Sequence, residues 1–198
     1  MPEEKSPLGY ELVKVIDTVR NKKDSAIVNT VSCTIIVLMI VFGAFLFGFQ
    51  RLEYMLTSGE PGVIRWFLFR LAVILLMAAA YVVVHEAVHA AFIKLIRKDA
   101  KLDFSYKVAY ATVSCDACFS KFEYFIISLA PILILGMILT AICFAVPEKW
   151  LWPVYIIQVL NLSSAAGDIY VFAILSRMPK NLLVRDGGDA VCVFVSIE

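Results

Sequence analysis

Residues 63–96 read VIRWFLFRLAVILLMAAAYVVVHEAVHAAFIKLI, and this stretch decides the fold of the chain. It holds no charged residue between Arg70 and Glu86. A helix needs about 20 mainly apolar residues to cross the hydrocarbon core of a bilayer. The stretch is longer than that, so it predicts a membrane-spanning helix with polar residues near one end.

Three further stretches are also long and apolar enough to span a membrane: 26–49, 122–146 and 150–175. The chain has 198 residues, of which 61% are hydrophobic and 18% are charged. Soluble domains are about 45–50% apolar and about 25% charged. The composition therefore excludes a soluble globular protein, and we expect an α-helical integral membrane protein with about four transmembrane helices.

Net charge and cysteine content exclude two other classes of protein. The formal net charge of +1 gives no basis for nucleic-acid binding. Five cysteines are an odd set, unlike the disulfide framework of a small secreted protein. The first apolar stretch also exceeds the about 7–15 apolar residues of a signal peptide, so we expect it to be a retained anchor.

The basic residues predict how the chain is oriented in the membrane. With four spans, 14 of the 18 lysines and arginines fall on one side, in the N-terminal segment (Lys5, Lys14, Arg20, Lys22, Lys23), between spans two and three (Lys94, Arg97, Lys98, Lys101, Lys107, Lys121) and in the tail (Arg177, Lys180, Arg185). Loops rich in lysine and arginine stay in the cytoplasm. Trp66, Trp150 and Trp152 then fall at the outer interface, where tryptophan is enriched. We expect a multi-pass protein of the cell membrane with both termini cytoplasmic.

The spans divide the chain into a cytoplasmic N-terminal segment (1–25), a four-span membrane domain (26–175) and a cytoplasmic tail (176–198). The lipid bilayer is the expected surrounding of the membrane domain. The sequence gives no indication of an oligomeric state.

Two segments outside the spans have the pattern of strands. Apolar and polar residues alternate over 102–110, which predicts a short cytoplasmic β-hairpin that closes through 111–121. In the tail, a turn at 186–189 precedes the strand-like residues 190–197.

The two histidines of the chain, His85 and His89, flank Glu86 in the motif His-Glu-x-x-His. Histidines four residues apart lie on one face of a helix, where both imidazoles can bind one zinc ion. The glutamate after the first histidine can take a proton from water bound to the metal. A pair of core histidines is the alternative, but polar side chains in a membrane helix are costly and usually functional.

Asp168 is the only charged residue between Lys149 and Arg177, so it needs a partner. It lies about 24 Å along a helix from Trp152, and His85 lies about 28 Å from Trp66, so the two have similar depths. Asp168 is therefore the candidate third zinc ligand, with pairing to a polar side chain of a neighbouring helix as the alternative. Asn161, on about the same face, is a possible contact to a substrate carbonyl or an oxyanion, or else an interhelical hydrogen bond.

The remaining polar groups carry weaker signals. Cys115 and Cys118 have metal or redox spacing, but a second such pair is absent and a reducing cytoplasm keeps thiols free. We interpret Glu123, Asp186 and Asp189 as solvated or interfacial charges.

Through His85–His89 and Asp168 the chain resembles the membrane-embedded zinc metalloproteases of the site-2 protease type. It is more closely similar to a small bacterial family of putative zincin peptidases, DUF3267. The similarity covers about residues 75–190 and includes Ser128-Leu129-Ala130-Pro131, Asn161 with Gly167-Asp168-Ile169-Tyr170, Met178-Pro179 and Arg185-Asp186. The resemblance to the site-2 protease type implies a zinc site in which an aspartate of a later span is the third ligand beside the two histidines.

The sequence thus favours a zinc-dependent endopeptidase that cuts a peptide bond in or near the cytoplasmic half of the membrane. His85, His89 and Asp168 would hold the zinc ion, and Glu86 would activate water. The substrate would be a membrane protein or a membrane-associated peptide, unwound and paired with the strand-like segment 102–110. The alternatives are a non-catalytic membrane protein that binds a metal or a partner, and a small ion transporter.

Overall fold

The structure, a computed structural model, describes residues 6–48, 63–106, 111–188 and 190–197. Residues 107–110 of the alternating segment lie outside the described residues. Within them, four helical segments are long and apolar enough to cross a membrane. They are α1 (Lys22–Phe47), α3 (Val63–Ile96), α4 (Lys121–Ala145) and the pair α5 (Glu148–Ser164) and α6 (Ala166–Ser176). Each lies within a few residues of a predicted span.

The fourth predicted span is not one continuous helix, because Ala165 separates α5 from α6. The hydroxyl groups of Ser163 and Ser164 donate to the carbonyls of Leu160 and Asn161. Serine side chains that bond nearby backbone in this way disfavour the interior of a helix. The break places Asp168 in the first turn of α6.

The described chain forms two compact units. The first, here called the sheet unit, contains residues 1–29, 86–131 and 167–198, and the second, the helical unit, contains residues 30–85 and 132–166. α3 and α4 contribute residues to both units.

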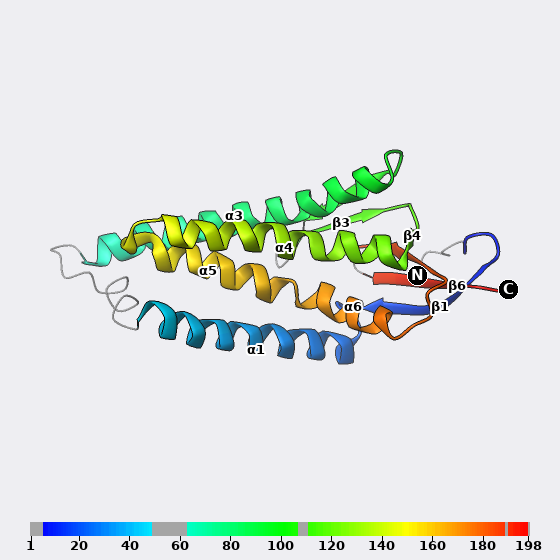
Figure 1. Ribbon diagram of the computed structural model, residues 1–198, viewed down its shortest axis with the longest axis horizontal. Helices are drawn as coiled ribbons and strands as arrows, with labels where there is room; N and C mark the ends of the chain where they lie inside the picture. Colours follow the sequence, from blue (N-terminus) through cyan, green and yellow to red (C-terminus); the bar gives the residue numbers. More distant parts are fainter. Residues whose placement is uncertain (1–5, 49–62, 107–110, 189, 198) are drawn as a thin grey trace. The chain divides into compact units, whose positions relative to one another are not determined.

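A four-stranded antiparallel sheet belongs to the sheet unit (Figure 1). Its strands are, in spatial order, β1 (Tyr10–Asp17), β6 (Ala190–Ser196), β5 (Leu182–Asp186) and β4 (Phe119–Ser120). β6 confirms the strand predicted in the tail. β1 was not predicted, because Glu11, Lys14 and Asp17 interrupt its apolar pattern; it pairs with β6 along its whole length around a bulge.

The predicted hairpin is confirmed in the described part of its sequence. β2 (Leu102–Tyr106) and β3 (Ala111–Cys115) pair in antiparallel register, with Phe104 opposite Val113. This two-stranded sheet is separate from the four-stranded one.

Side chains fix the start of α4. The Ser120 hydroxyl accepts the backbone N–H of Glu123, and the Glu123 carboxylate accepts that of Ser120. This reciprocal capping box fixes the first turn of α4. Glu123 also forms a two-point ion pair with Arg97, at 2.9 and 3.0 Å. Glu123, interpreted as a solvated or interfacial charge, is 26% exposed, so that interpretation is not contradicted, but the residue also has a structural role.

α4 and α6 are joined within the same unit. Lys121 donates to the carbonyls of Ser176 and Met178 at the end of α6, and the rings of Phe125 and Phe172 lie 4.2 Å apart between centroids. The buried core beneath them includes Ile93, Phe119, Leu175, Val184 and Val193. These contacts hold the ends of α3, α4 and α6 in one arrangement.

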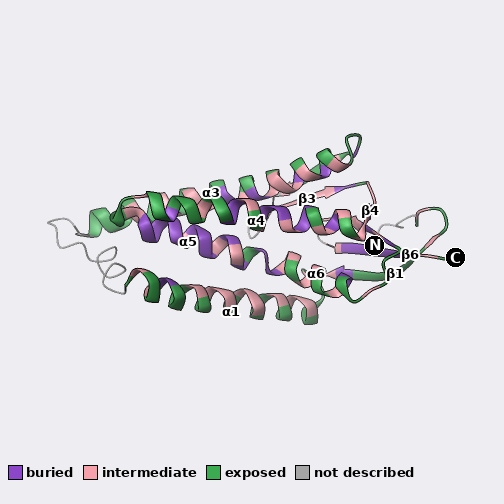
Figure 2. Ribbon diagram, in the orientation of Figure 1, coloured by how far each residue is buried: buried purple, intermediate pink, exposed green. Residues whose placement is uncertain are grey.

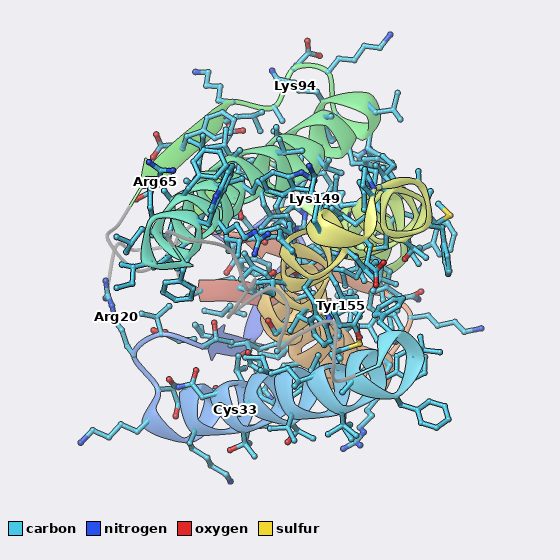
Figure 3. The ribbon with its side chains drawn as sticks, turned by 90° about the vertical axis from the view of Figure 1, so that its left-hand side faces the viewer. Arg20, Cys33, Arg65, Lys94, Lys149 and Tyr155 are labelled. Atoms are coloured by element: carbon cyan, nitrogen blue, oxygen red, sulfur yellow. The ribbon has the colours of Figure 1, made fainter. Side chains whose placement is uncertain are left out.

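In the helical unit, α5 is the buried helix (Figure 2). The Tyr155 side chain, labelled in Figure 3, reaches from α5 to α1, where its hydroxyl donates to the Met39 carbonyl at 2.6 Å. A side chain at Gly43 would overlap the Tyr155 ring, so only glycine permits this approach of α1. Trp152 is 3% exposed and packs on Phe47 and Tyr155. It is a core side chain of this unit, and its predicted place at the outer membrane interface stays a prediction.

Candidate metal centre

His85, Glu86 and His89 lie on α3, which runs unbroken through this segment. The two histidines are one helical turn apart, so their imidazoles leave the same face of the helix. His85 is 7% exposed, and the His89 side chain is 12% exposed. Both rings are thus largely withdrawn from the surface of the chain.

The His89 ring is oriented by α4. Its Nδ1 lies 2.9 Å from the Ile127 carbonyl oxygen. A carbonyl oxygen can only accept a hydrogen bond, so Nδ1 carries the proton and Nε2 carries the lone pair. That Nε2 lies 3.8 Å from Asp168 Oδ2. The candidate ligand atom of His89 therefore points to the Asp168 carboxylate.

Asp168 is held in a similar way from its other side. The Ser128 hydroxyl, 2% exposed on α4, donates to Asp168 Oδ1 at 3.1 Å. This bond turns Oδ2 towards His89. The position in the first turn of α6 also suits a carboxylate, since the N-terminus of a helix favours negative charge.

The ligand atoms of His85, His89 and Asp168 all lie within 4.8 Å of one another. Two imidazole nitrogens and one carboxylate oxygen form a donor set that catalytic zinc sites use. Hydrogen bonds from other groups hold His85 at Nδ1, His89 at Nδ1 and Asp168 at Oδ1. Zinc ligands are ordinarily oriented by such outer partners. The residues present therefore fit a zinc ion.

Glu86 contacts the hairpin. Its Oε2 accepts the backbone N–H of Val113, in β3, at 2.8 Å. That N–H points to the carboxylate, so β3 lies beside Glu86. Glu86 also interacts electrostatically with His89 and Asp168. The glutamate of the motif is therefore near the candidate ligands and is fixed by a strand of the hairpin.

Asn161 is fully buried and forms hydrogen bonds between helices. Its Nδ2 donates to the Ile132 carbonyl of α4, and its Oδ1 accepts the Tyr81 hydroxyl of α3. The interhelical hydrogen bond, one of its two expected roles, is therefore present. The contact to a substrate stays a prediction.

Sequence reasoning missed the side chains that orient the candidate ligands, Tyr81 and Ser128. Tyr81 lies four residues before His85, so the helical period could have placed it on the same face. Ser128 is on a different helix, 40 residues before Asp168, and no pattern in the sequence links the two.

Asp186 was interpreted as a solvated or interfacial charge, and its hydrogen bonds within the protein correct the first of these alternatives. Its Oδ2 accepts the hydroxyl of buried Tyr124 at 3.1 Å, and its Oδ1 accepts the backbone N–H of Gly188 at 2.9 Å. Burial raises the pKa of the Asp186 carboxyl above its usual range. Asp189 lies outside the described residues.

The cysteine pair gains no support as a metal or redox site. Cys115 is buried in β3, where burial raises the pKa of its thiol to about 11. The thiolate is the form that binds metals and reacts, and at that pKa it is scarce at neutral pH. In the described part of the chain, all five cysteines are unbridged.

The comparison with known families gives a match over the middle of the chain. The model of the family described as "Putative zincin peptidase", DUF3267, matches residues 78–183, which contain all five residues singled out as candidate site residues. No curated protein and no solved structure gives a significant match.

Proposed function

Because the chain belongs to the putative zincin peptidase family DUF3267, whose description implies a zinc cofactor, we propose that it is a membrane-embedded zinc endopeptidase. The proposed reaction is hydrolysis of a peptide bond in or near the cytoplasmic half of the membrane. One observation carries the proposal: the ligand atoms of His85, His89 and Asp168 converge within 4.8 Å. The other polar atom of each side chain forms a hydrogen bond: Nδ1 of His85 with Tyr81, Nδ1 of His89 with the Ile127 carbonyl, and Oδ1 of Asp168 with Ser128.

His85, His89 and Asp168 would hold the zinc ion, and Glu86 would act as the general base. When bound, zinc supplies Lewis acidity that polarises a peptide carbonyl and lowers the pKa of water. The Val113 N–H holds Oε2 of Glu86. The other oxygen, Oε1, takes the proton of the attacking water and later gives it to the amide nitrogen that leaves.

The substrate would be a membrane protein or membrane-associated peptide, bound in extended form. A peptide bond inside a helix is shielded by its hydrogen bonds, so the substrate must unwind before attack. An extended peptide can add to a strand through backbone hydrogen bonds. The β2–β3 hairpin is the proposed docking element, and the contact of Val113 with Glu86 supports this, since it brings β3 beside the general base.

The proposed orientation predicts where the chain ends lie. Because lysine and arginine concentrate on one side of the four apolar helices, both termini should be cytoplasmic. A fluorescent protein fused at either end should fluoresce, whereas alkaline phosphatase, active only outside the cytoplasm, should be inactive at both ends. Active phosphatase at either end would contradict this orientation.

Metal removal tests the proposed activity. We expect the purified full-length chain, reconstituted in lipid nanodiscs, to cleave unstructured membrane-anchored peptides. Treatment with a chelator should abolish cleavage, and added zinc should restore it, because the ion supplies the Lewis acid. A zinc-loaded protein that cleaves none of a broad set of such peptides would favour a non-catalytic metal-binding protein. Ion flux without cleavage would favour a transporter.

A further inference from the structure

A buried chain of hydrogen bonds ends on His85. The Tyr81 hydroxyl lies 2.8 Å from His85 Nδ1 and 3.2 Å from Asn161 Oδ1. Tyr81 is 6% exposed, His85 is 7% exposed and Asn161 is fully buried, so solvent does not compete for these bonds. All three residues belong to the helical unit.

The bond between Asn161 and Ile132, at the other end of this series, decides which atom donates and which accepts in each bond. The Asn161 amide faces the Ile132 carbonyl at 3.4 Å. A carbonyl oxygen cannot donate, so the group that faces it must be the NH₂ of the amide. Asn161 therefore presents its oxygen to Tyr81, and an amide oxygen can only accept a hydrogen bond.

The Tyr81 hydroxyl has one proton, which it donates in a hydrogen bond to Asn161 Oδ1. The phenol oxygen then meets His85 Nδ1 as an acceptor, so Nδ1 must carry the proton of the neutral imidazole. The lone pair of the ring is left on Nε2. The Ser164 hydroxyl donates to the Asn161 carbonyl, so it meets the Tyr81 oxygen, 2.9 Å away, as a second acceptor, which again leaves that oxygen an acceptor towards His85.

We infer that Tyr81 and Asn161 are positioning residues that fix the tautomer of His85, so that Nε2 is the nitrogen offered to the metal. The inference rests on the proposed role of His85 as a zinc ligand. Asn161 acts here through Tyr81 rather than on the substrate, which gives this buried amide a function.

The tautomer is a readout that a merely structural role would not move. In zinc-free protein labelled with ¹⁵N-histidine, the chemical shifts of the ring nitrogens report which one carries the proton. The chain has only two histidines, so the variant His89→Ala assigns the signals of His85. We expect the proton on Nδ1 in the wild-type chain and a shift of population towards Nε2 in Asn161→Leu, since the Tyr81 hydroxyl loses one of its two other acceptors and then donates more often to Nδ1.

Zinc affinity is the second readout. Loss of an outer partner of a metal ligand typically weakens binding about 10–100-fold. We expect a loss of that size in Tyr81→Phe and in Asn161→Leu, measured by competition with a chelating dye.

Gln158 provides the matched control. It is a buried amide nearly one turn earlier on α5, and it donates to the Gly136 carbonyl and the Thr140 hydroxyl rather than to Tyr81. Gln158→Met should leave both the His85 tautomer and the zinc affinity unchanged. If Gln158→Met changes them as Asn161→Leu does, the effect is general loss of packing and the inference is wrong.

The outcomes separate this inference from the proposed function. If the proton of His85 stays on Nδ1 in Asn161→Leu, the inference is wrong, even if zinc affinity falls. A proton on Nε2 in the wild-type chain also overturns it. Failure of the wild-type chain to bind zinc would remove the proposed function, while the tautomer of the zinc-free protein would still test the hydrogen-bond chain.

Discussion

The variant Glu86→Gln is expected to lower the rate of peptide hydrolysis by about 10²–10⁴-fold, the usual contribution of a general base. An amide of the same size cannot take the proton of the attacking water. Its oxygen can still accept the Val113 N–H, so the local structure should persist. The measurement is the initial cleavage rate of a membrane-anchored peptide, together with zinc content by elemental analysis, which should match that of the wild type.

Glu123→Gln is the control for this variant. Glu123 caps α4 and pairs with Arg97, outside the candidate centre. Glutamine also serves in a capping box, so the first turn of α4 should remain intact. We expect cleavage near the wild-type rate in this variant. Retained cleavage in Glu86→Gln would remove Glu86 from its proposed role.

The second large effect is expected on zinc binding. The wild-type chain should bind about one zinc ion, and His89→Ala or Asp168→Ala should each reduce the content to background, because a catalytic site has about three protein ligands. Ser128→Ala should weaken binding less, by about 10–100-fold, since it removes only the bond that turns Asp168. The measurements are elemental analysis and dye competition on protein purified in detergent.

Asp116→Asn is the matched control for Asp168→Ala. Asp116 is an exposed carboxylate that accepts the backbone N–H of Lys101, away from the candidate ligands. The zinc content of the Asp116→Asn variant should equal that of the wild type. Loss of zinc in His89→Ala but not in Asp168→Ala would support His89 as a ligand and show that the third ligand is a side chain other than Asp168.

The helices and the hairpin were predictable because their signals are local. An apolar run long enough to span a bilayer, or an alternation of apolar and polar residues, is contained in one short window of sequence. β1 was missed because its strand is stabilised by pairing with β6, at the other end of the chain, rather than by its own pattern. The break at Ala165 was missed because the mean hydropathy of a long segment does not show that serine hydroxyl groups bond to the backbone of their own helix.

His85, Glu86 and His89 could be placed on one turn of an apolar helix from their spacing alone, since helical periodicity is a local property. Which groups face these side chains depends instead on the packing of the helices. Ile127 and Ser128 lie 38 and 40 residues from His89 and Asp168, the groups they orient, and Tyr81 meets Asn161 from 80 residues away. Hydrogen bonds of that kind depend on how helices pack, and no spacing within a single helix encodes them.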